Sequence, residues 1–349
     1  MEKKEIKGAV KILVFFVVLA IVLQVLSQAV FTKGDAATYN NKYANAYSYM
    51  LEPENTIQVA AFGNSDLYSA IAPTVVWQTA GITSTNVASP LQSVRQSYMM
   101  LEQFLKKQSP QVVVIETDML YKHQPDRDRD YSKEQGEQAL DTLFDMTDAE
   151  RMDDFIKSRF SIFVFHDKWK ALFKTQKMAE RDLASHGYHL SLKVKPFKLE
   201  DFMKKSDNLD TMTYVQEQGI TDVINLCKSK GIQVLLMEMP SMNSWSYERH
   251  NAMEAFAKAQ GVRFLDFNVL WDELGISEKT DFRDRGNHMN YYGAQKVSAY
   301  YGEYLAQEFG LEDLRGNADY SFWDDSIAEF QKAVDDSEAD KAQKDKKNG

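Results

Sequence analysis

Two short segments carry residue types that suit nucleophilic catalysis. Ser65 stands in Gly63-Asn64-Ser65-Asp66, directly after the apolar run IQVAAF at residues 57–62. His288 stands far along the chain, with Asp284 four residues before it. A serine hydroxyl becomes an effective nucleophile when a base takes its proton, and a histidine oriented by a carboxylate suits that task at neutral pH. Because Asp284 lies close before His288, one segment supplies both the base and the carboxylate that orients it.

Both segments also have a purely structural interpretation. Serine is a common N-cap residue, so Ser65 can serve to start a helix. The stretch Asp281–Asn290 can equally be a charged surface loop. In the catalytic interpretation, Gly63 permits a tight turn, and the helix N-terminus with its adjacent amides stabilises a developing oxyanion. The other five histidines form no metal-ligand spacing, and we expect neither a metal nor an organic cofactor.

Apolar runs alternate with amphipathic stretches over most of the chain, which predicts an α/β fold with a parallel sheet covered by helices on both faces. Expected strands are 57–62, 82–88, 111–117, 232–239 and 262–267; expected helices are 66–79, 93–108, 214–229, 246–259 and 291–308. Sites in such sheets form beyond the carboxyl ends of the strands, where Ser65 falls.

The remaining sequence suggests further segments around a domain of residues 56–317. Residues 122–210 are highly charged with helical patches, and we interpret them as a helical insertion. Residues 32–55 are polar and aromatic, typical of a stalk that docks onto the domain. Residues 318–349 are charged, and we expect a disordered tail.

The N-terminus predicts a membrane anchor. Residues 12–31 are mostly apolar and uncharged, about the ~20 residues that a helix needs to cross a bilayer. Four lysines lie within the short segment 1–11, which places the N-terminus in the cytoplasm and the domain outside the cell. The alternatives are a cleaved signal peptide, with Ser27-Gln28-Ala29 as the cleavage site, and a buried core helix.

Composition excludes several classes of function. The chain has 349 residues with 41 Lys and Arg against 51 Asp and Glu, a net charge of −10. Nucleic-acid binding needs clustered positive charge, so we expect no nucleic-acid partner. Cys227 is the single cysteine, which excludes an intrachain disulfide and a cysteine-based zinc cluster.

Taken together, these segments resemble the SGNH (GDSL-like) hydrolase superfamily over about residues 55–308, interrupted by the insertion. The resemblance rests on the following segments: AFGNSD around Ser65, Gly81-Ile82-Thr83, Ser109-Pro110 before VVVIET, and Asp284 through Asn290 with Gly293 in HMNYYGAQK. It implies a three-layer α/β/α sandwich of SGNH- or flavodoxin-like type, preceded here by one transmembrane helix.

The resemblance further implies a catalytic triad, with Ser65 as nucleophile and His288 as base. The superfamily usually places the orienting Asp three residues before the histidine, where this chain has Arg285. We therefore expect Asp284 to be the orienting carboxylate, on a loop one residue longer, with Asp281 as the alternative.

The superfamily's oxyanion-hole Gly and Asn follow the second and third strands. Here those places read Ala88-Ser89-Pro90 and Thr117-Asp118-Met119. We expect the oxyanion hole to use the amide of Ser65 together with the amide of Ser89 or another donor. The candidate substrate contacts, for each of which packing or a salt bridge is the alternative role, are Asn64, Asp66, Asp118, Arg127, Trp245 and Asn290.

More closely, the chain resembles membrane-anchored SGNH-like proteins of Gram-positive bacteria, which are related to proteins of alginate-type O-acetylation and of lipoteichoic acid D-alanylation. The anchor, FHDKWKAL at 165–172 and HGYHLS at 186–191 carry this likeness. It implies extracytoplasmic O-acylation, above all O-acetylation, of a cell-envelope polysaccharide or teichoic acid, with a membrane-bound O-acyltransferase as partner. The alternatives are a stand-alone carbohydrate esterase and a non-catalytic envelope binding protein.

Overall fold

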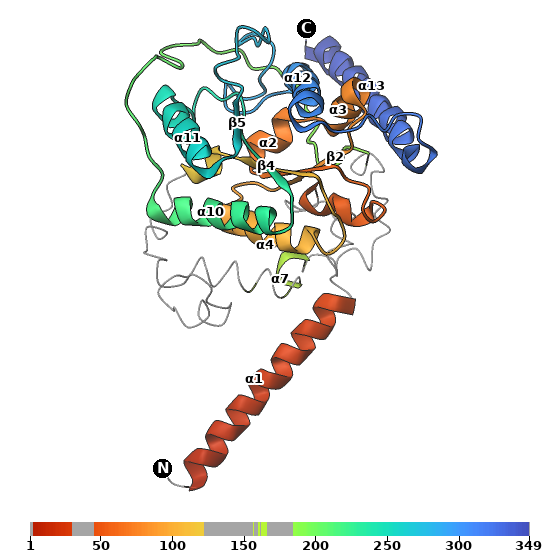
Figure 1. Ribbon diagram of the computed structural model, residues 1–349. Helices are drawn as coiled ribbons and strands as arrows, with labels where there is room; N and C mark the ends of the chain where they lie inside the picture. The colour runs from red at the N-terminus through yellow and green to blue at the C-terminus, as the bar shows by residue number, and fades with distance from the viewer. Residues whose placement is uncertain are drawn as a thin grey trace.

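The computed structural model describes residues 3–29, 45–121, 156, 160, 162–165 and 184–348. Its centre is a five-stranded, fully parallel sheet in the order β2-β1-β3-β4-β5 (Figure 1). The strands are β1 (Val59–Gly63), β2 (Ser84–Ala88), β3 (Val112–Glu116), β4 (Gln233–Glu238) and β5 (Arg263–Asp266). All five lie within the ranges expected from the sequence or extend them by one residue. The α/β fold class is confirmed.

Helices cover both faces of the sheet, as Figure 1 shows. One face carries α4 (Val94–Phe104) and α10 (Tyr214–Ser229), and the other carries α2 (Ser65–Ala70), α3 (Pro73–Ala80) and α12 (Tyr291–Phe309). A further helix, α11 (Tyr247–Gln260), packs beside β5. Alternate residues of each strand enter the two cores: Phe62 packs with the α4 and α10 side, whereas Ala61 packs with the α2 and α12 side.

The expected helix over 66–79 is two helices. Ile71 has an extended backbone, and Pro73 is the first residue of α3. Proline has no N–H to continue a helix and suits a first helical position. The backbone groups freed at the break are satisfied elsewhere, since the Asn86 side chain donates to the Ile71 carbonyl at 2.8 Å and the Ser298 hydroxyl accepts from the Ala72 N–H at 2.8 Å.

The described part of the expected helical insertion is mostly not helical, so that expectation is wrong for residues 184–210. They form no regular helix or strand, although α7 (Ile162–Phe165) lies earlier in the insertion. Residues 184–197, which we call the strap, instead hydrogen-bond through their backbone to β2, to α2 and to the loop before α12. The His186 carbonyl accepts from the Asn86 N–H at 3.0 Å, and the Lys195 N–H donates to the Phe282 carbonyl at 2.8 Å. Residues 122–155 lie outside the described residues.

The expectation of a disordered tail at 318–349 is also wrong. A short 3-10 helix, η5 (Ala318–Tyr320), precedes the long helix α13 (Phe322–Asn348). Trp323 is fully buried and stacks on Trp77, with ring centroids 5.6 Å apart, and on His186, at 3.7 Å. Phe330 follows two helical turns later and is also buried. Although the helix is mostly charged, one of its faces is apolar and packs on the strap.

The N-terminal helix α1 (Lys3–Ala29) extends away from the domain (Figure 1). Its segment Lys7–Ser27 has a mean hydropathy of 2.8, long and apolar enough to cross a membrane. Part of the expected stalk is the 3-10 helix η2 (Asn45–Leu51), where Tyr49 packs on Phe104 with ring centroids 4.7 Å apart. Residues 30–44 lie outside the described residues.

Candidate active site

The turn between β1 and α2 presents Ser65. Gly63 ends β1, Asn64 is the N-cap of α2, and Ser65 is its first residue. The Asn64 side chain accepts a hydrogen bond from the Asp66 N–H at 2.8 Å. Asn64 therefore performs the capping that sequence alone allowed for Ser65. The Ser65 hydroxyl is left for another partner, and Ser65 remains partly exposed.

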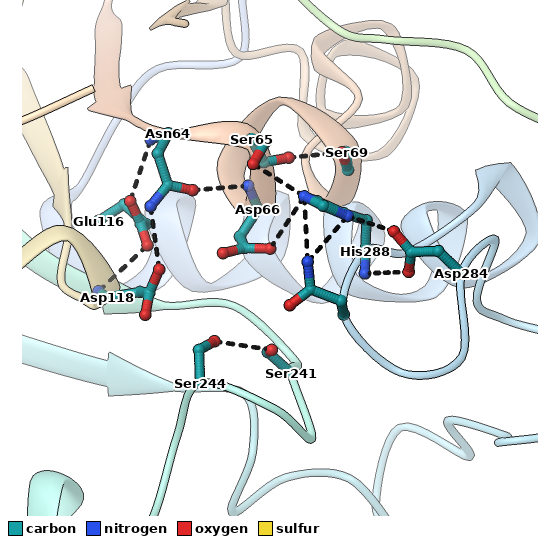
Figure 2. Close-up of polar contacts among 11 residues, drawn as sticks. Asn64, Ser65, Asp66, Ser69, Glu116, Asp118, Ser241, Ser244, Asp284 and His288 are labelled. Carbon is teal, nitrogen blue, oxygen red and sulfur yellow. Dashed lines mark hydrogen bonds and ion pairs between the residues drawn. The ribbon is translucent and has the colours of Figure 1, made fainter. Parts of the chain in front are cut away.

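That partner is His288. Its Nε2 lies 2.8 Å from the Ser65 Oγ, across 223 residues of sequence (Figure 2). On the other side of the ring, Nδ1 is hydrogen-bonded to Oδ2 of Asp284. The second carboxylate oxygen of Asp284 accepts the backbone N–H of His288 at 2.7 Å. The three side chains form a continuous serine–histidine–aspartate chain of hydrogen bonds, the geometry by which such triads are recognised.

The loop geometry explains which aspartate contacts the histidine. Arg285 and Gly286 both have left-handed backbones, with φ of 72° and 94°, so the loop turns back on itself and brings Asp284 to His288. Asp281 is committed elsewhere: its Oδ2 accepts from the Ser277 N–H at 2.8 Å and from the Lys296 Nζ at 2.7 Å. The structure therefore brings Asp284, and not Asp281, to the histidine.

Two carboxylates, from Asp284 and Asp66, lie beside the ring of His288. Burial opposes ionisation of Asp284, but hydrogen bonds from the His288 side chain and backbone outweigh it and hold the pKa of Asp284 below its usual value. Oδ1 of the buried Asp66 lies 3.6 Å from His288 Nε2. Two carboxylates thus flank the imidazole and can stabilise an imidazolium. Asn287, which sequence reasoning missed, also lies beside the ring, with its Nδ2 3.1 Å from Nδ1.

A buried polar network holds the turn from behind (Figure 2). The Asn64 N–H donates to Oε2 of Glu116 at 3.1 Å, and the Asn64 side chain donates to Oδ2 of Asp118 at 3.0 Å. A Cβ on Gly63 would lie 2.6 Å from the Glu116 Cβ, so only glycine fits there. Carboxylate oxygens of Asp66, Glu116 and Asp118 come within 4.8 Å of one another, a spacing that a cation could use. Because donors from the protein already contact Glu116 and Asp118, we interpret the group as support for the turn.

The remaining candidates from the sequence fall into different settings. Ala88 pairs with Gly63 in the sheet, so Ser89 lies at the same edge as the turn, and its hydroxyl donates to Gln92 at 3.0 Å. The use of its amide in an oxyanion hole stays a prediction. Trp245 donates to Asp266 at 2.8 Å, and Asn290 caps α12, which gives both a structural task. Arg127 lies outside the described residues.

Three further side chains near Ser65 escaped sequence reasoning: Tyr68, His189 and Arg283. Tyr68 is three residues after Ser65 in α2, so the shared helix face was a usable signal. His189 belongs to the strap, and its own backbone N–H donates to the Tyr68 carbonyl at 2.8 Å. The Arg283 N–H donates to the His288 carbonyl at 3.0 Å within the catalytic loop, and neither of these backbone contacts has a sequence signal.

No protein-family model and no curated protein matches this chain. Solved structures similar to it include the following three. An acylhydrolase structure from Bacteroides fragilis has 11% sequence identity and a TM-score of 0.37, with 77% of this chain and 97% of that chain covered. A GDSL-like lipase from Bacteroides thetaiotaomicron has 14% identity and a TM-score of 0.36, with 80% and 100% covered. A gut microbial diltiazem-metabolizing enzyme has 16% identity and a TM-score of 0.28, with 74% and 48% covered.

Proposed function

We propose that this protein is a serine acyl-transfer enzyme that works through an acyl-Ser65 intermediate. The observation that carries the proposal is the hydrogen-bonded chain from the Ser65 hydroxyl through His288 to Asp284. Ser65 and His288 stay partly exposed while the groups behind them are buried, so a substrate can reach the hydroxyl. Activated nucleophiles of this kind perform ester hydrolysis and acyl transfer.

The chemistry follows from the positions of the three side chains. His288 Nε2 takes the Ser65 proton as Oγ bonds to the carbonyl carbon of the acyl donor. The resulting tetrahedral oxyanion collapses, the bond to the leaving oxygen breaks, and His288 returns the proton to that oxygen. A second hydroxyl then gives its proton to His288 and attacks the acyl-serine. The bond to Ser65 Oγ breaks, and His288 returns the proton to that oxygen, which restores Ser65. Asp284 fixes the tautomer with the proton on Nδ1 and stabilises the imidazolium in both steps.

We further propose that the second hydroxyl belongs to a cell-envelope polysaccharide or teichoic acid, that the acyl group is acetyl, and that a membrane-bound O-acyltransferase delivers it. In this proposal α1 anchors the chain with its N-terminus in the cytoplasm and the domain outside, where no acetyl-coenzyme A is at hand. Support comes from the apolar length of α1 and the lysines at its N-terminal end. Water as acceptor turns the same site into an esterase, the second candidate, because the two reactions share the acyl-serine step.

The test uses the full chain in detergent with 4-nitrophenyl acetate as the acyl donor. We expect nitrophenolate release and an acetyl group on the Ser65 peptide, both lost in Ser65→Ala and His288→Ala. Ser244→Ala is the matched control, because its hydroxyl contacts Ser241 rather than His288. Undiminished release by folded Ser65→Ala protein would refute the proposal and bring the non-catalytic alternative forward. Adding polyol acceptors to the same assay separates transfer from hydrolysis.

A further inference from the structure

Arg283 is a partly buried cation to which the proposed reaction gives no role. It precedes Asp284 on the catalytic loop, and its side chain is partly buried. Its Nη1 atom is shielded from solvent and has no hydrogen-bond partner within the described residues. Buried polar groups in native proteins are almost always paired, and an exception points to a water or an ion. A guanidinium also binds carboxylates and phosphates through two parallel hydrogen bonds.

The groups near Arg283 include the neutral side chains of Tyr68, Tyr188 and His189, and the carboxylate of Asp284 also lies within its field. Burial raises the pKa of Tyr68, and Arg283 opposes the rise by its charge and by hydrogen bonding. Desolvation, together with the charges of Arg283 and His288, lowers the pKa of His189 to about 4, so His189 is neutral at pH 7. The hydroxyl of the buried Tyr188, also within the field of Arg283, has no partner among the described residues.

These groups lie beside the nucleophile. Tyr68 is on α2, three residues after Ser65. The rings of Tyr68 and His189 meet edge to face, with centroids 5.9 Å apart. The acidic neighbours are engaged elsewhere: Asp284 is hydrogen-bonded to the His288 side chain and backbone, and the buried Asp66 lies toward His288 Nε2.

We propose that Arg283, with Tyr68, Tyr188 and His189, forms an anion-binding subsite beside Ser65 and that it holds a carboxylate or phosphate of the acceptor. The part concerning the acceptor rests on the proposed acyl transfer, whereas the binding of an anion does not. An anionic group fixed by Arg283 places neighbouring hydroxyls of the same molecule near Ser65. The acceptor in this proposal carries a phosphate or a carboxylate near the hydroxyl that receives the acyl group.

Three small polyols test the subsite: glycerol, glycerol 3-phosphate and glycerate, which are neutral, phosphorylated and carboxylated. Their binding to the full chain in detergent is measured by ligand-observed NMR. We expect at least one anion to bind about tenfold or more tightly than glycerol, because a hydrogen bond to a charged group is worth about that factor. Preference for glycerol 3-phosphate indicates an acceptor that carries phosphate, and preference for glycerate indicates an acceptor that carries a carboxylate.

Two substitutions decide whether Arg283 is responsible. Arg283→Gln should reduce anion binding about tenfold, to near the level of glycerol. Arg285→Gln removes the same charge two residues away, from an exposed side chain, and should leave anion binding within about twofold. Anions that bind no better than glycerol, or equal losses in both variants, would overturn the proposal.

The test of the anion subsite can succeed or fail independently of the test of acyl transfer. Ser65→Ala keeps Arg283 and the aromatic groups and should retain the preference for the anion. An inactive wild-type chain that still prefers the anion through Arg283 would retain the subsite and remove the acyl-transfer chemistry. An active wild-type chain without that preference would do the reverse.

Discussion

Replacement of Asp284 by Asn is the sharpest test of its role in orienting His288. The carboxylate accepts two hydrogen bonds from His288, one from Nδ1 and one from the backbone N–H at 2.7 Å. An asparagine of the same shape can keep the backbone contact, but its amide can also donate to Nδ1. That interaction favours the tautomer with the proton on Nε2, which cannot accept the Ser65 proton.

The expected magnitude follows from what the carboxylate supplies. One hydrogen bond to a charged group is worth about 1.5–3 kcal/mol, and loss of the imidazolium's counter-charge adds to it. The Asp284 side chain is 34% exposed, so solvent screens part of the charge effect. We expect the acylation barrier to rise by about 2–4 kcal/mol, a decrease in rate of about 30- to 1000-fold.

The assay is the rate of nitrophenolate release from 4-nitrophenyl acetate, with folding checked by cooperative thermal unfolding. Asp281→Asn is the matched control. It removes a carboxylate from the same loop that contacts Lys296 and the Ser277 N–H, so it should lower stability more than the rate per folded molecule. Folded Asp284→Asn protein that retains at least a third of the wild-type rate would refute the assigned role.

Three further substitutions test the fold around the site. Trp323→Ala should reduce the free energy of unfolding by about 3–5 kcal/mol, measured by urea denaturation, because Trp323 is fully buried. Gly63→Ala should destabilise by about 1–3 kcal/mol and reduce nitrophenolate release, because the new methyl overlaps Glu116. Burial lowers the pKa of His250, but the hydrogen bond to Asp266 and its charge outweigh this, so the pKa is raised overall. That pair stabilises the fold below the ordinary histidine pKa and loses the contribution as pH rises through the raised value, so His250→Gln should lower the urea midpoint more at about pH 5.5 than at about pH 9.

Local sequence patterns were enough to predict the strands of the sheet and the two segments that carry Ser65 and His288. Continuous apolar runs identified the buried parallel strands, and the turn after β1 identified Ser65. The short distance in sequence between Asp284 and His288 allowed their pairing to be predicted. The left-handed backbones of Arg285 and Gly286 turn the loop between them and bring the two side chains together. These features depend on short-range backbone geometry, which sequence patterns encode directly.

Features set by long-range contacts were missed. The charged composition of 318–349 concealed α13, whose few apolar residues gain stability only by packing on Trp77 and the strap. Likewise, the strap lacks periodicity because it forms neither a helix nor a strand, and its backbone bonds to separate elements, among them β2 and α2. Arg283 and His189 meet near Ser65 only after the strap and the catalytic loop have been placed, so their types and spacing gave no warning.

The central claim is that Ser65 is an activated nucleophile. Treatment of the full chain with a fluorophosphonate, followed by mass analysis of the intact protein and its peptides, tests it most directly. We predict a single adduct on Ser65 that is absent from folded His288→Ala protein. No adduct, an adduct on another serine, or equal labelling of the His288→Ala variant would contradict the account.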